Sequence, residues 1–245
     1  MCMAVDAMES ASVASALRRS LPAGLVAVIL VGLAVWLGLW QLSRAQDKRA
    51  RQTACDAAAA LPALDLAAAP DGIAVCRRVR VIGRFDAPHQ IYLDNRIYQG
   101  RPGYQAVAPL LYPGGVVLVN RGWLPASGDH AVTPRAKVPA GPLILEGLVV
   151  PARARYLELS RRDVAGPVWE NLDLARLRAW YGGGLPDRLV LQTSPADDGL
   201  VRDWPRPDTG VQRHLGYAGQ WFALAVLITV LYVYHGLWRP AYAPR

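Results

Sequence analysis

The sequence has few of the residues that bind metals or act as nucleophiles in enzymes. Its 245 residues include 3 cysteines and 4 histidines, and no two cysteines form a Cys-x-x-Cys pair. It also contains no glycine-rich phosphate loop, no nucleophile elbow and no His-Glu-x-x-His zinc motif. His89 and His130 both follow turn residues, where surface histidines are common. We therefore expect a protein that is not an enzyme and holds no metal through its own clustered side chains.

Charge is absent from two long stretches, which lie between Arg19 and Arg44 and between Arg213 and Arg239. About 20 apolar residues are enough to cross a bilayer as a helix. The first stretch is too long for the apolar region of a signal peptide, and no Ala-x-Ala cleavage site follows it directly. We predict a membrane-anchored chain of five segments: an unstructured tail (1–20), a transmembrane helix (21–43), one domain (44–213), a second transmembrane helix (214–238) and a tail (239–245).

Basic residues are scattered and form no run interleaved with aromatic residues, although the net charge is +8. Nucleic acid is therefore a poor candidate partner, and arginines that face lipid headgroups or solvent explain the charge more simply. The charges beside the membrane helices do not decide the orientation. Arg18 and Arg19 precede the first helix, whereas Arg44 and Lys48 follow it, and long loops are translocated largely regardless of charge.

The segment between the predicted membrane helices is rich in β-strand patterns. Residues 77–85 alternate valines with arginines, as a half-buried strand does. A Tyr-Pro-Gly-Gly sequence at 112–115 predicts a hairpin. The expected fold class is α+β, with a mainly antiparallel barrel or sandwich and one short helix over 172–181 that ends at Gly182. Residues 57–70 are expected to form a short helix or linker. The predicted strands cover 77–85, 90–93, 103–111, 116–120, 143–150, 169–171 and 189–192.

Two of the cysteines, Cys55 and Cys76, lie early in the predicted domain, and Cys2 lies in the N-terminal tail. In a periplasmic domain the first two would be able to form a disulfide. The alternative is that they are two unrelated small apolar residues, because the sequence does not show whether their Cα atoms come within about 7 Å.

The second membrane helix has two unlike faces at its start. At 100° per residue, one face carries His214 with tyrosine, tryptophan and alanine side chains, and the opposite face carries Gly216, Gly219 and Ala223. Small residues allow close helix approach, so we predict that the glycine face packs against Ala34 and Gly38 of the first helix. The histidine face would then be free for a ligand. The alternative is an ordinary aromatic belt at the membrane interface.

Two short clusters in the domain place an arginine beside a glycine and an aromatic residue near a strand end. The first contains Asn95, Arg96 and Tyr104, and the second is Asn120-Arg121-Gly122-Trp123. Such positions let the backbone approach a ligand or partner closely. The alternative interpretation is a tight turn with an arginine stacked on an aromatic ring, and the residues alone favour it.

These segments, taken in order, resemble the Surfeit locus protein family (Surf/Shy). The resemblance covers residues 37–222 and is weak over 131–213. Its most specific elements are the Asn-Arg-Gly-Trp and His-x-x-Tyr-Ala-x-Gln-Trp motifs. The matching segments are Leu-Gly-Leu-Trp-Gln-Leu-Ser-Arg at 37–44 with Lys48, Gly-Arg-Phe at 83–85, Leu-Asp-Asn-Arg at 93–96, Gly-Tyr at 103–104, Pro-Leu at 109–110, Val-Asn-Arg-Gly-Trp at 119–123 and the segment 214–222.

The resemblance implies a cytochrome c oxidase assembly factor of the bacterial inner membrane, with both termini cytoplasmic and the domain periplasmic. It implies haem a as a transient cofactor, which the protein would help to insert or stabilise in the catalytic oxidase subunit, with His214 as the iron ligand. The implied partners are that subunit, the haem a synthase and the membrane. The residues expected at the haem are His214, Tyr217, Gln220 and Trp221, and those expected at haem propionates or oxidase subunits are Asn95, Arg96, Tyr104, Asn120, Arg121 and Trp123.

Two other functions are consistent with the same sequence. A scaffold that holds an oxidase subunit without touching haem would tolerate loss of His214 but not of Arg121 or Trp123. A two-span sensor with a periplasmic ligand domain is the third hypothesis, and the short segment after Arg239 disfavours it.

Overall fold

The computed structural model describes residues 2–68, 73–127, 133–152, 166–204 and 210–238. The chain divides into two compact units. One unit consists of Met1–Gln52 and Pro207–Arg245, and the other is Thr53–Arg206. We describe each unit by itself.

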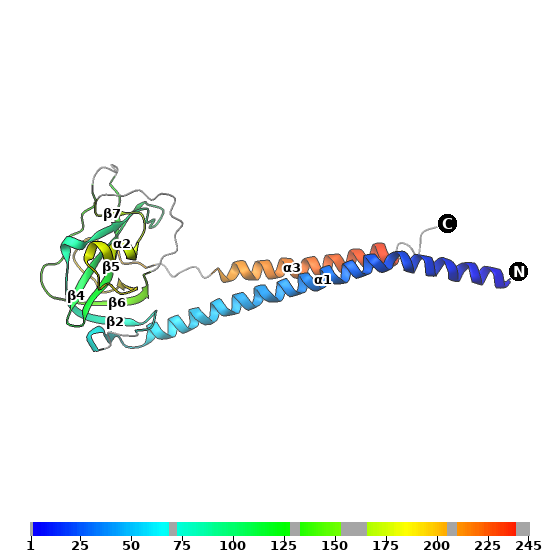
Figure 1. The fold of residues 1–245 in the computed structure, drawn as a ribbon, viewed down its shortest axis with the longest axis horizontal. Helices are drawn as coiled ribbons and strands as arrows, with labels where there is room; N and C mark the ends of the chain where they lie inside the picture. Colours follow the sequence, from blue (N-terminus) through cyan, green and yellow to red (C-terminus); the bar gives the residue numbers. More distant parts are fainter. Residues whose placement is uncertain (1, 69–72, 128–132, 153–165, 205–209, 239–245) are drawn as a thin grey trace. The chain divides into compact units, whose positions relative to one another are not determined.

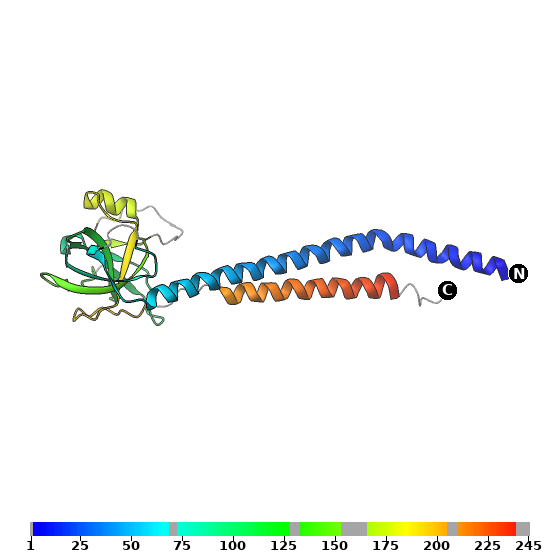
Figure 2. The ribbon, with the colours of Figure 1, turned by 90° about the horizontal axis from the view of Figure 1, so that it is seen from below.

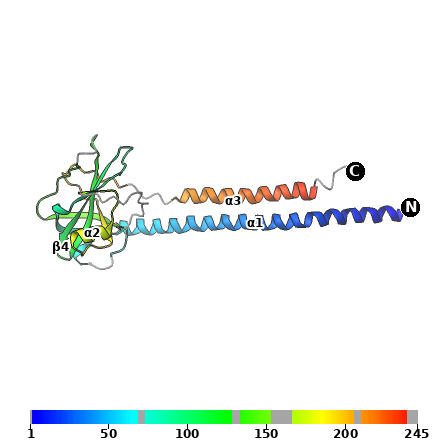
Figure 3. The same ribbon diagram turned by 45° about the horizontal axis from the view of Figure 1, so that its top comes forward.

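The first unit is built from two helices, α1 (Cys2–Ala60), whose last eight residues belong to the second unit, and α3 (Val211–Tyr232). Helix α3 continues into a π-helix, η3 (Val233–Trp238). The two helices lie side by side (Figures 1 and 3). The segments Pro22–Ala60 and Val211–His235 are long and apolar enough to cross a membrane. Most of their large apolar side chains are exposed, as lipid-facing side chains would be. Two candidate membrane helices therefore bracket the domain, as predicted.

Helix α1 begins earlier than expected. It begins at Cys2, so the prediction of an unstructured tail over 1–20 is wrong. That segment is rich in alanine and methionine, which are strong helix formers. Pro22 lies inside the helix, and α1 bends in its blue N-terminal part (Figure 2), as expected where a proline removes a backbone hydrogen bond. At its other end the helix continues past the predicted span to Ala60.

The second unit is a barrel-like sheet (Figure 1). The strand order is β1-β2-β6-β8-β5-β4-β3-β7, and an additional pairing of β2 with β4 closes β2, β6, β8, β5 and β4 into a ring. The pairs β1–β2, β3–β7 and β5–β8 are parallel, and the other pairs are antiparallel. The strands are β1 (Leu64–Asp65), β2 (Arg78–Phe85), β3 (Ile91–Leu93), β4 (Gly103–Tyr112), β5 (Gly115–Pro125), β6 (Leu143–Pro151), β7 (Val168–Trp169) and β8 (Arg188–Gln192).

These strands confirm the mainly antiparallel prediction, and the seven expected strands are present. Strand β5 extends five residues beyond the predicted end at Asn120, and β1 was not predicted. In β2 buried and exposed residues alternate along the whole strand. Its buried side chains Val79, Val81 and Phe85 join leucines and valines of β4, β5, β6 and β8 in one apolar core. The sequence period therefore located the face of β2 that lines the barrel.

The short helix α2 (Leu174–Tyr181) lies where a helix was predicted and begins two residues later. The Asp173 carboxylate accepts hydrogen bonds from the backbone N–H groups of Ala175 and Arg176 at 2.8 and 3.1 Å, so it is the N-cap. Gly182 ends the helix in the left-handed conformation, with a φ of 90°. Two 3-10 helices, Leu66–Ala68 and Ala87–His89, complete the unit.

Cys55 and Cys76 form a disulfide, with their Cα atoms 5.1 Å apart. Cys55 lies in the last turns of α1 and Cys76 lies just before β2. The Arg77 guanidinium also donates a hydrogen bond to the Ala58 carbonyl oxygen at 3.3 Å. The end of α1 is therefore fastened to the barrel by a covalent bond and by a side chain that satisfies a helix carbonyl.

Candidate functional site

The contact between α1 and α3 is made by small residues of α1 and rings of α3. A side-chain carbon added at Gly38 would lie 2.6 Å from the Phe222 ring, and one added at Gly24 would lie 2.5 Å from the Tyr232 hydroxyl. Gly38 thus faces Phe222, and Gly24, earlier in α1, faces Tyr232, later in α3, so the helices are antiparallel. Ala34 is 2% exposed. The predicted role of Ala34 and Gly38 as the close-packing surface of the first helix is consistent with these contacts.

The face of α3 that meets α1 is the histidine face, whereas the sequence analysis expected the glycine face. Ala218 and Ala225 are buried. By contrast, none of the described residues lies within 4 Å of a side-chain carbon added at Gly216 or Gly219, and Ala223 is exposed. The physical reason is that α1 already supplies the small residues. Packing large rings of α3 into that surface gains more dispersion contact than packing glycine on glycine.

His214 lies in the first turn of α3 and reaches across to α1. Its Nδ1 is 2.6 Å from the Gln41 side-chain oxygen Oε1, and the ring is partly buried. Because an amide oxygen only accepts hydrogen bonds, Nδ1 is the donor. Nε2 of the neutral ring then carries the lone pair, and it has no hydrogen-bond partner among the described residues. The site therefore presents one imidazole nitrogen that is able to bind a metal.

The other residues predicted at the haem differ in their position relative to His214. Tyr217 is 49% exposed and Trp221 is partly buried, and both lie within 60° of His214 around the helix axis. Gln220 is exposed and lies 120° away from His214 around the helix axis. Tyr217 and Trp221 are thus placed to flank a ligand of His214, and Gln220 is not.

Within the described residues, no group of three or more histidine, cysteine, aspartate or glutamate side chains is arranged to hold a metal ion. His235 is 21 residues after His214, roughly 31 Å along a helix. His214 would therefore supply one axial bond to an iron atom, and these two helices offer no second histidine in reach.

The Asn-Arg-Gly-Trp motif of β5 forms a β-bulge. Ala106 of β4 pairs with Gly122, and the next residue, Val107, pairs with Asn120, so Arg121 is the extra residue in β5. Gly122 has a φ of 143°, and a side chain there would meet the Leu200 side chain and the Val201 backbone at 2.8 Å. Glycine is therefore required at this point of the bulge.

The bulge turns Arg121 into the interior, where it is 0% exposed. Its guanidinium donates to the Gln90 side-chain oxygen, to the Lys137 carbonyl oxygen at 2.6 Å and to the Asp198 carboxylate at 2.8 Å. It also lies over the Phe85 ring, 5.0 Å from the ring centre. Burial lowers the pKa of the Arg121 guanidinium, and the Asp198 carboxylate opposes that effect. Arginine remains charged nonetheless, so this is a buried ion pair.

The structure contradicts a contact of Arg121 with haem propionates or an oxidase subunit, because no part of its side chain reaches the surface of the unit. Asn120 is 3% exposed and donates to the Gln105 side-chain oxygen at 3.1 Å. Trp123 is 8% exposed. These residues match the alternative interpretation, in which the motif is turn structure with an arginine stacked on a ring.

The two polar clusters meet at Trp123. Its indole N–H donates to the Arg96 carbonyl oxygen at 2.7 Å, and its ring lies 5.2 Å from the Tyr98 ring. A side chain at Gly103 would collide with the Trp123 ring at 2.5 Å. The buried Trp123 thus supports the turn that carries Asn95 and Arg96.

Asn95 and Arg96 themselves remain accessible. Asn95 is exposed, with a φ of 55°, and Arg96 is half-buried, with its guanidinium 3.3 Å from the Glu170 carbonyl oxygen. The next residue, Ile97, is 71% exposed. Of the residues predicted to contact partners, these two are the ones that the structure leaves in a position to do so.

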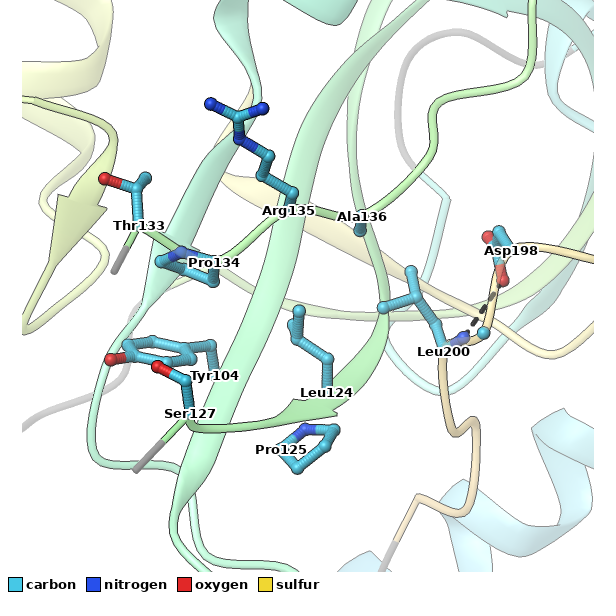
Figure 4. Close-up of a pocket in the computed structure, with 11 residues that line it drawn as sticks. Tyr104, Leu124, Pro125, Ser127, Thr133, Pro134, Arg135, Ala136, Asp198 and Leu200 are labelled. Carbon is cyan, nitrogen blue, oxygen red and sulfur yellow. Dashed lines mark hydrogen bonds between the residues drawn. The ribbon is translucent and has the colours of Figure 1, made fainter. Parts of the chain in front are cut away.

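A cavity of about 710 Å³ lies on the domain between the end of β5, residues 133–136 and residues 198–200 (Figure 4). Its one acidic residue, Asp198, accepts from the Leu200 N–H at 3.2 Å and is already paired with Arg121 and Arg202. Tyr104 lines the cavity and is 4% exposed. Burial raises the pKa of the Tyr104 phenol, and the Asp94 carboxylate adds to this. Among the described residues that line the cavity there is no histidine, cysteine or methionine.

Sequence reasoning missed three residues that these sites depend on: Gln41, Gln90 and Asp198. Gln41 lay inside a motif of the resemblance, and a polar side chain in a predicted membrane helix was a signal that it had a partner. Gln90 and Asp198 are 31 and 77 positions from Arg121, and no local pattern connects them to it.

Comparison with known proteins agrees with this architecture. The model of the SURF1 family matches residues 28–226. A SURF1-like protein of Rickettsia felis is 28% identical over 216 residues, which are 85% of this chain and 94% of the relative. A SURF1-like protein of Rickettsia conorii is 28% identical over 204 residues, which are 80% of this chain and 84% of the relative. Because the family model covers well over half of the sequence, the chain belongs to the SURF1 family.

Proposed function

We propose that this protein is an assembly factor for cytochrome c oxidase that binds haem a through His214 and passes it to the catalytic oxidase subunit. The observation that carries the proposal is the state of the His214 ring. One ring nitrogen is hydrogen-bonded to Gln41, and the other has no partner among the described residues. A neutral imidazole held in this way is a suitable axial ligand for haem iron.

The surroundings of His214 fit a flat apolar ligand with a polar edge. Tyr217 and Trp221 lie on the same side of α3, and Tyr217 is half-exposed. The charged run Arg44–Arg51 follows Gln41 directly in α1, so His214 and Gln41 lie near the domain-side ends of the apolar spans. Haem a would supply the redox centre of the recipient oxidase. The protein's own residues would bind one face of it and exclude water from that face.

We also propose that the domain is periplasmic and both termini are cytoplasmic. The disulfide between Cys55 and Cys76 supports this orientation, because disulfides persist in the bacterial periplasm and are rare in the cytosol. The catalytic oxidase subunit and the haem a synthase are the partners that this function requires.

The test is to produce the full chain together with the haem a synthesis enzymes, purify it in detergent, and record its visible spectrum and pyridine haemochrome. His214→Ala is the test variant. His235→Ala is the matched control, because it removes a histidine from the far end of the same helical segment. Haem a in the parent and in His235→Ala, with most of it lost from His214→Ala, supports the proposal. Equal haem in all three proteins would remove His214 from the site.

A haem-free scaffold remains the second candidate, and the turn at Asn95–Ile97 favours it. An exposed isoleucine beside an accessible arginine is the composition of a protein contact rather than of solvated surface. Loss of Arg121 or Trp123 does not distinguish the scaffold from the haem carrier, because both side chains are buried and their loss would disturb the fold itself. The exposed double variant Arg96→Ala/Ile97→Ser does discriminate. If it abolishes oxidase assembly while His214→Ala does not, the scaffold is correct.

A further inference from the structure

We propose that Gln41 is the positioning residue of the haem site: it holds the His214 ring in the Nδ1–H tautomer, directs Nε2 at the iron, and keeps the bond to iron weak enough for release. The proposal rests on the haem function proposed above. It goes beyond that function by assigning the strength of haem binding to a residue of the other helix.

The hydrogen bond between Gln41 and His214 selects one tautomer of the ring. The distance of 2.6 Å between Nδ1 and Oε1 is short for a hydrogen bond between neutral groups. A free histidine ring exchanges its proton between the two nitrogens, and only the tautomer with Nδ1–H leaves Nε2 available to a metal. An amide oxygen fixed at Nδ1 selects that tautomer before any ligand arrives.

The Gln41 side chain is held in place by its position on the packed face of α1. The most buried positions of the membrane part of α1 are Ala34, Gly38 and Ala45, and together with Gln41 they recur at intervals of four, three and four residues. This is the spacing of a helix face that packs against a neighbour. Gly38 receives the Phe222 ring one turn before Gln41. Gln41 therefore lies within the packed face of α1, where a long side chain has little freedom.

The group that accepts the hydrogen bond from His214 is a neutral amide. A metal-bound histidine commonly donates its second N–H to a carboxylate or a carbonyl, and a carboxylate makes the ring more basic and the metal bond stronger. Among the described residues the partner of His214 is an amide, and no acidic side chain is hydrogen-bonded to the ring. A neutral acceptor orients the ring without strengthening the iron bond as a carboxylate would. That combination suits a carrier that must give up its cargo.

The first experiment measures the tautomer directly in the haem-free full chain in detergent. Nitrogen-15 NMR of labelled histidine, with His214→Ala used to assign the signal, reports which ring nitrogen carries the proton. The measurement is made above the ordinary imidazole pKa of about 6.5. We expect Nδ1–H in the parent and a shift toward Nε2–H in Gln41→Leu. Gln46→Leu is the matched control, because Gln46 is exposed on the same helix. An Nε2–H parent overturns the proposal, because the Gln41 amide group would then be the donor.

The second experiment compares haem a binding and reduction potential in the parent, Gln41→Leu, Gln41→Asn and Gln41→Glu. Loss of a residue that orients a metal ligand typically weakens metal binding by about 10- to 100-fold, so we expect that loss in Gln41→Leu. The shorter amide of Gln41→Asn should not reach Nδ1 and should behave similarly. Gln41→Glu should release haem more slowly and lower its reduction potential. A circular dichroism melt of each variant verifies that the helices still pack.

The outcomes separate this proposal from the function on which it rests. If the parent and Gln41→Leu bind haem a with equal affinity and equal spectra, the role of Gln41 is wrong and the haem function stands. If the parent binds no haem, the haem function is wrong. The pairing of Gln41 with His214 is then only a contact between helices, and the proposal falls with it.

Discussion

The His214 region of the helical unit and the Arg121 region of the barrel carry the two most specific motifs of this chain, yet they use their polar side chains in opposite ways. Arg121 is 0% exposed and donates hydrogen bonds to three groups of the protein. His214 is partly buried, and one of its two ring nitrogens is hydrogen-bonded to Gln41. The Arg121 guanidinium is bound within the fold, whereas Nε2 of His214 has no hydrogen-bond partner among the described residues.

The difference follows from the local backbone. The bulge in β5 directs its extra residue, Arg121, into the interior of the barrel. A buried polar group is stable only when it is hydrogen-bonded, so Arg121 needs partners within the protein. A residue in the first turn of a membrane helix has a neighbour on one side and open surface on the other. A motif residue is thus a candidate for function where the backbone leaves part of its side chain unused.

The largest expected effect is that of Arg121→Ala on the stability of the domain. Removing one partner of a buried ion pair typically lowers the free energy of unfolding by about 3–5 kcal/mol, and here Asp198 would lose one of its two arginines. Denaturant unfolding of the full chain in detergent measures it, with the exposed Arg80→Ala as control. A loss as small as the control's would mean that Arg121 is not the centre of this network.

Removing the disulfide with Cys55→Ser should have the next largest effect. The bond closes a loop with a sequence separation of 21. A disulfide that closes a loop of about that size typically adds about 3 kcal/mol to the free energy of unfolding. Thermal unfolding with and without a reducing agent measures the loss. The parent should fall to the level of the variant when reduced, and Cys2→Ser should behave as the parent does. Two free thiols at Cys55 and Cys76 in protein isolated under non-reducing conditions would contradict the pairing and remove the support for a periplasmic domain.

Two glycine substitutions compare the faces of the helical unit. Gly38→Leu would collide with the Phe222 ring, and overpacking of this kind typically costs about 1–3 kcal/mol. A side-chain carbon added at Gly219 meets nothing within 4 Å among the described residues, so we expect the melting temperature of Gly219→Leu in detergent to stay at the parent value. Equal destabilisation by both variants would show that the glycine face also packs within this chain. A stable Gly219→Leu protein that fails in oxidase assembly would assign that face to a partner helix.

The smallest expected effect is that of Trp123→Phe. The ring and most of its packing remain, but the Arg96 carbonyl oxygen loses its hydrogen bond from the indole, which is worth about 1 kcal/mol. Denaturant unfolding should show that small loss. In an oxidase assembly assay the effect should be weaker than that of Arg96→Ala/Ile97→Ser if the turn contacts a partner. The reverse order would mean that Trp123 does more than support the turn.

Features with a regular period or a simple composition were predictable from the sequence. The alternation of residues 78–85 identified the strand and its buried face, and the lack of charge between Arg19 and Arg44 identified a helix that is apolar enough to cross a membrane. The end of α2 at Gly182 followed from local backbone preference. Each of these signals lies within one short stretch of consecutive residues, over which the period of a single helix or strand can be recognised.

The face of α3 that meets α1 was not predictable in the same way. Both faces were suitable by spacing, one with glycines and one with alanines and rings. The choice depended on the small residues of α1 around Gly38, against which the Phe222 ring packs more extensively than a glycine would.

By itself the sequence determined the two helices that are long and apolar enough to cross a membrane, the β-rich domain between them, the short helix α2 and the family. Only the tertiary structure decided that Arg121 is buried and that His214 is paired with Gln41, 173 positions away. The reason is that local patterns record how a segment meets water or lipid, whereas the partner of a polar side chain is set by which distant segment packs against it. The atoms left over after that pairing are the ones available for function.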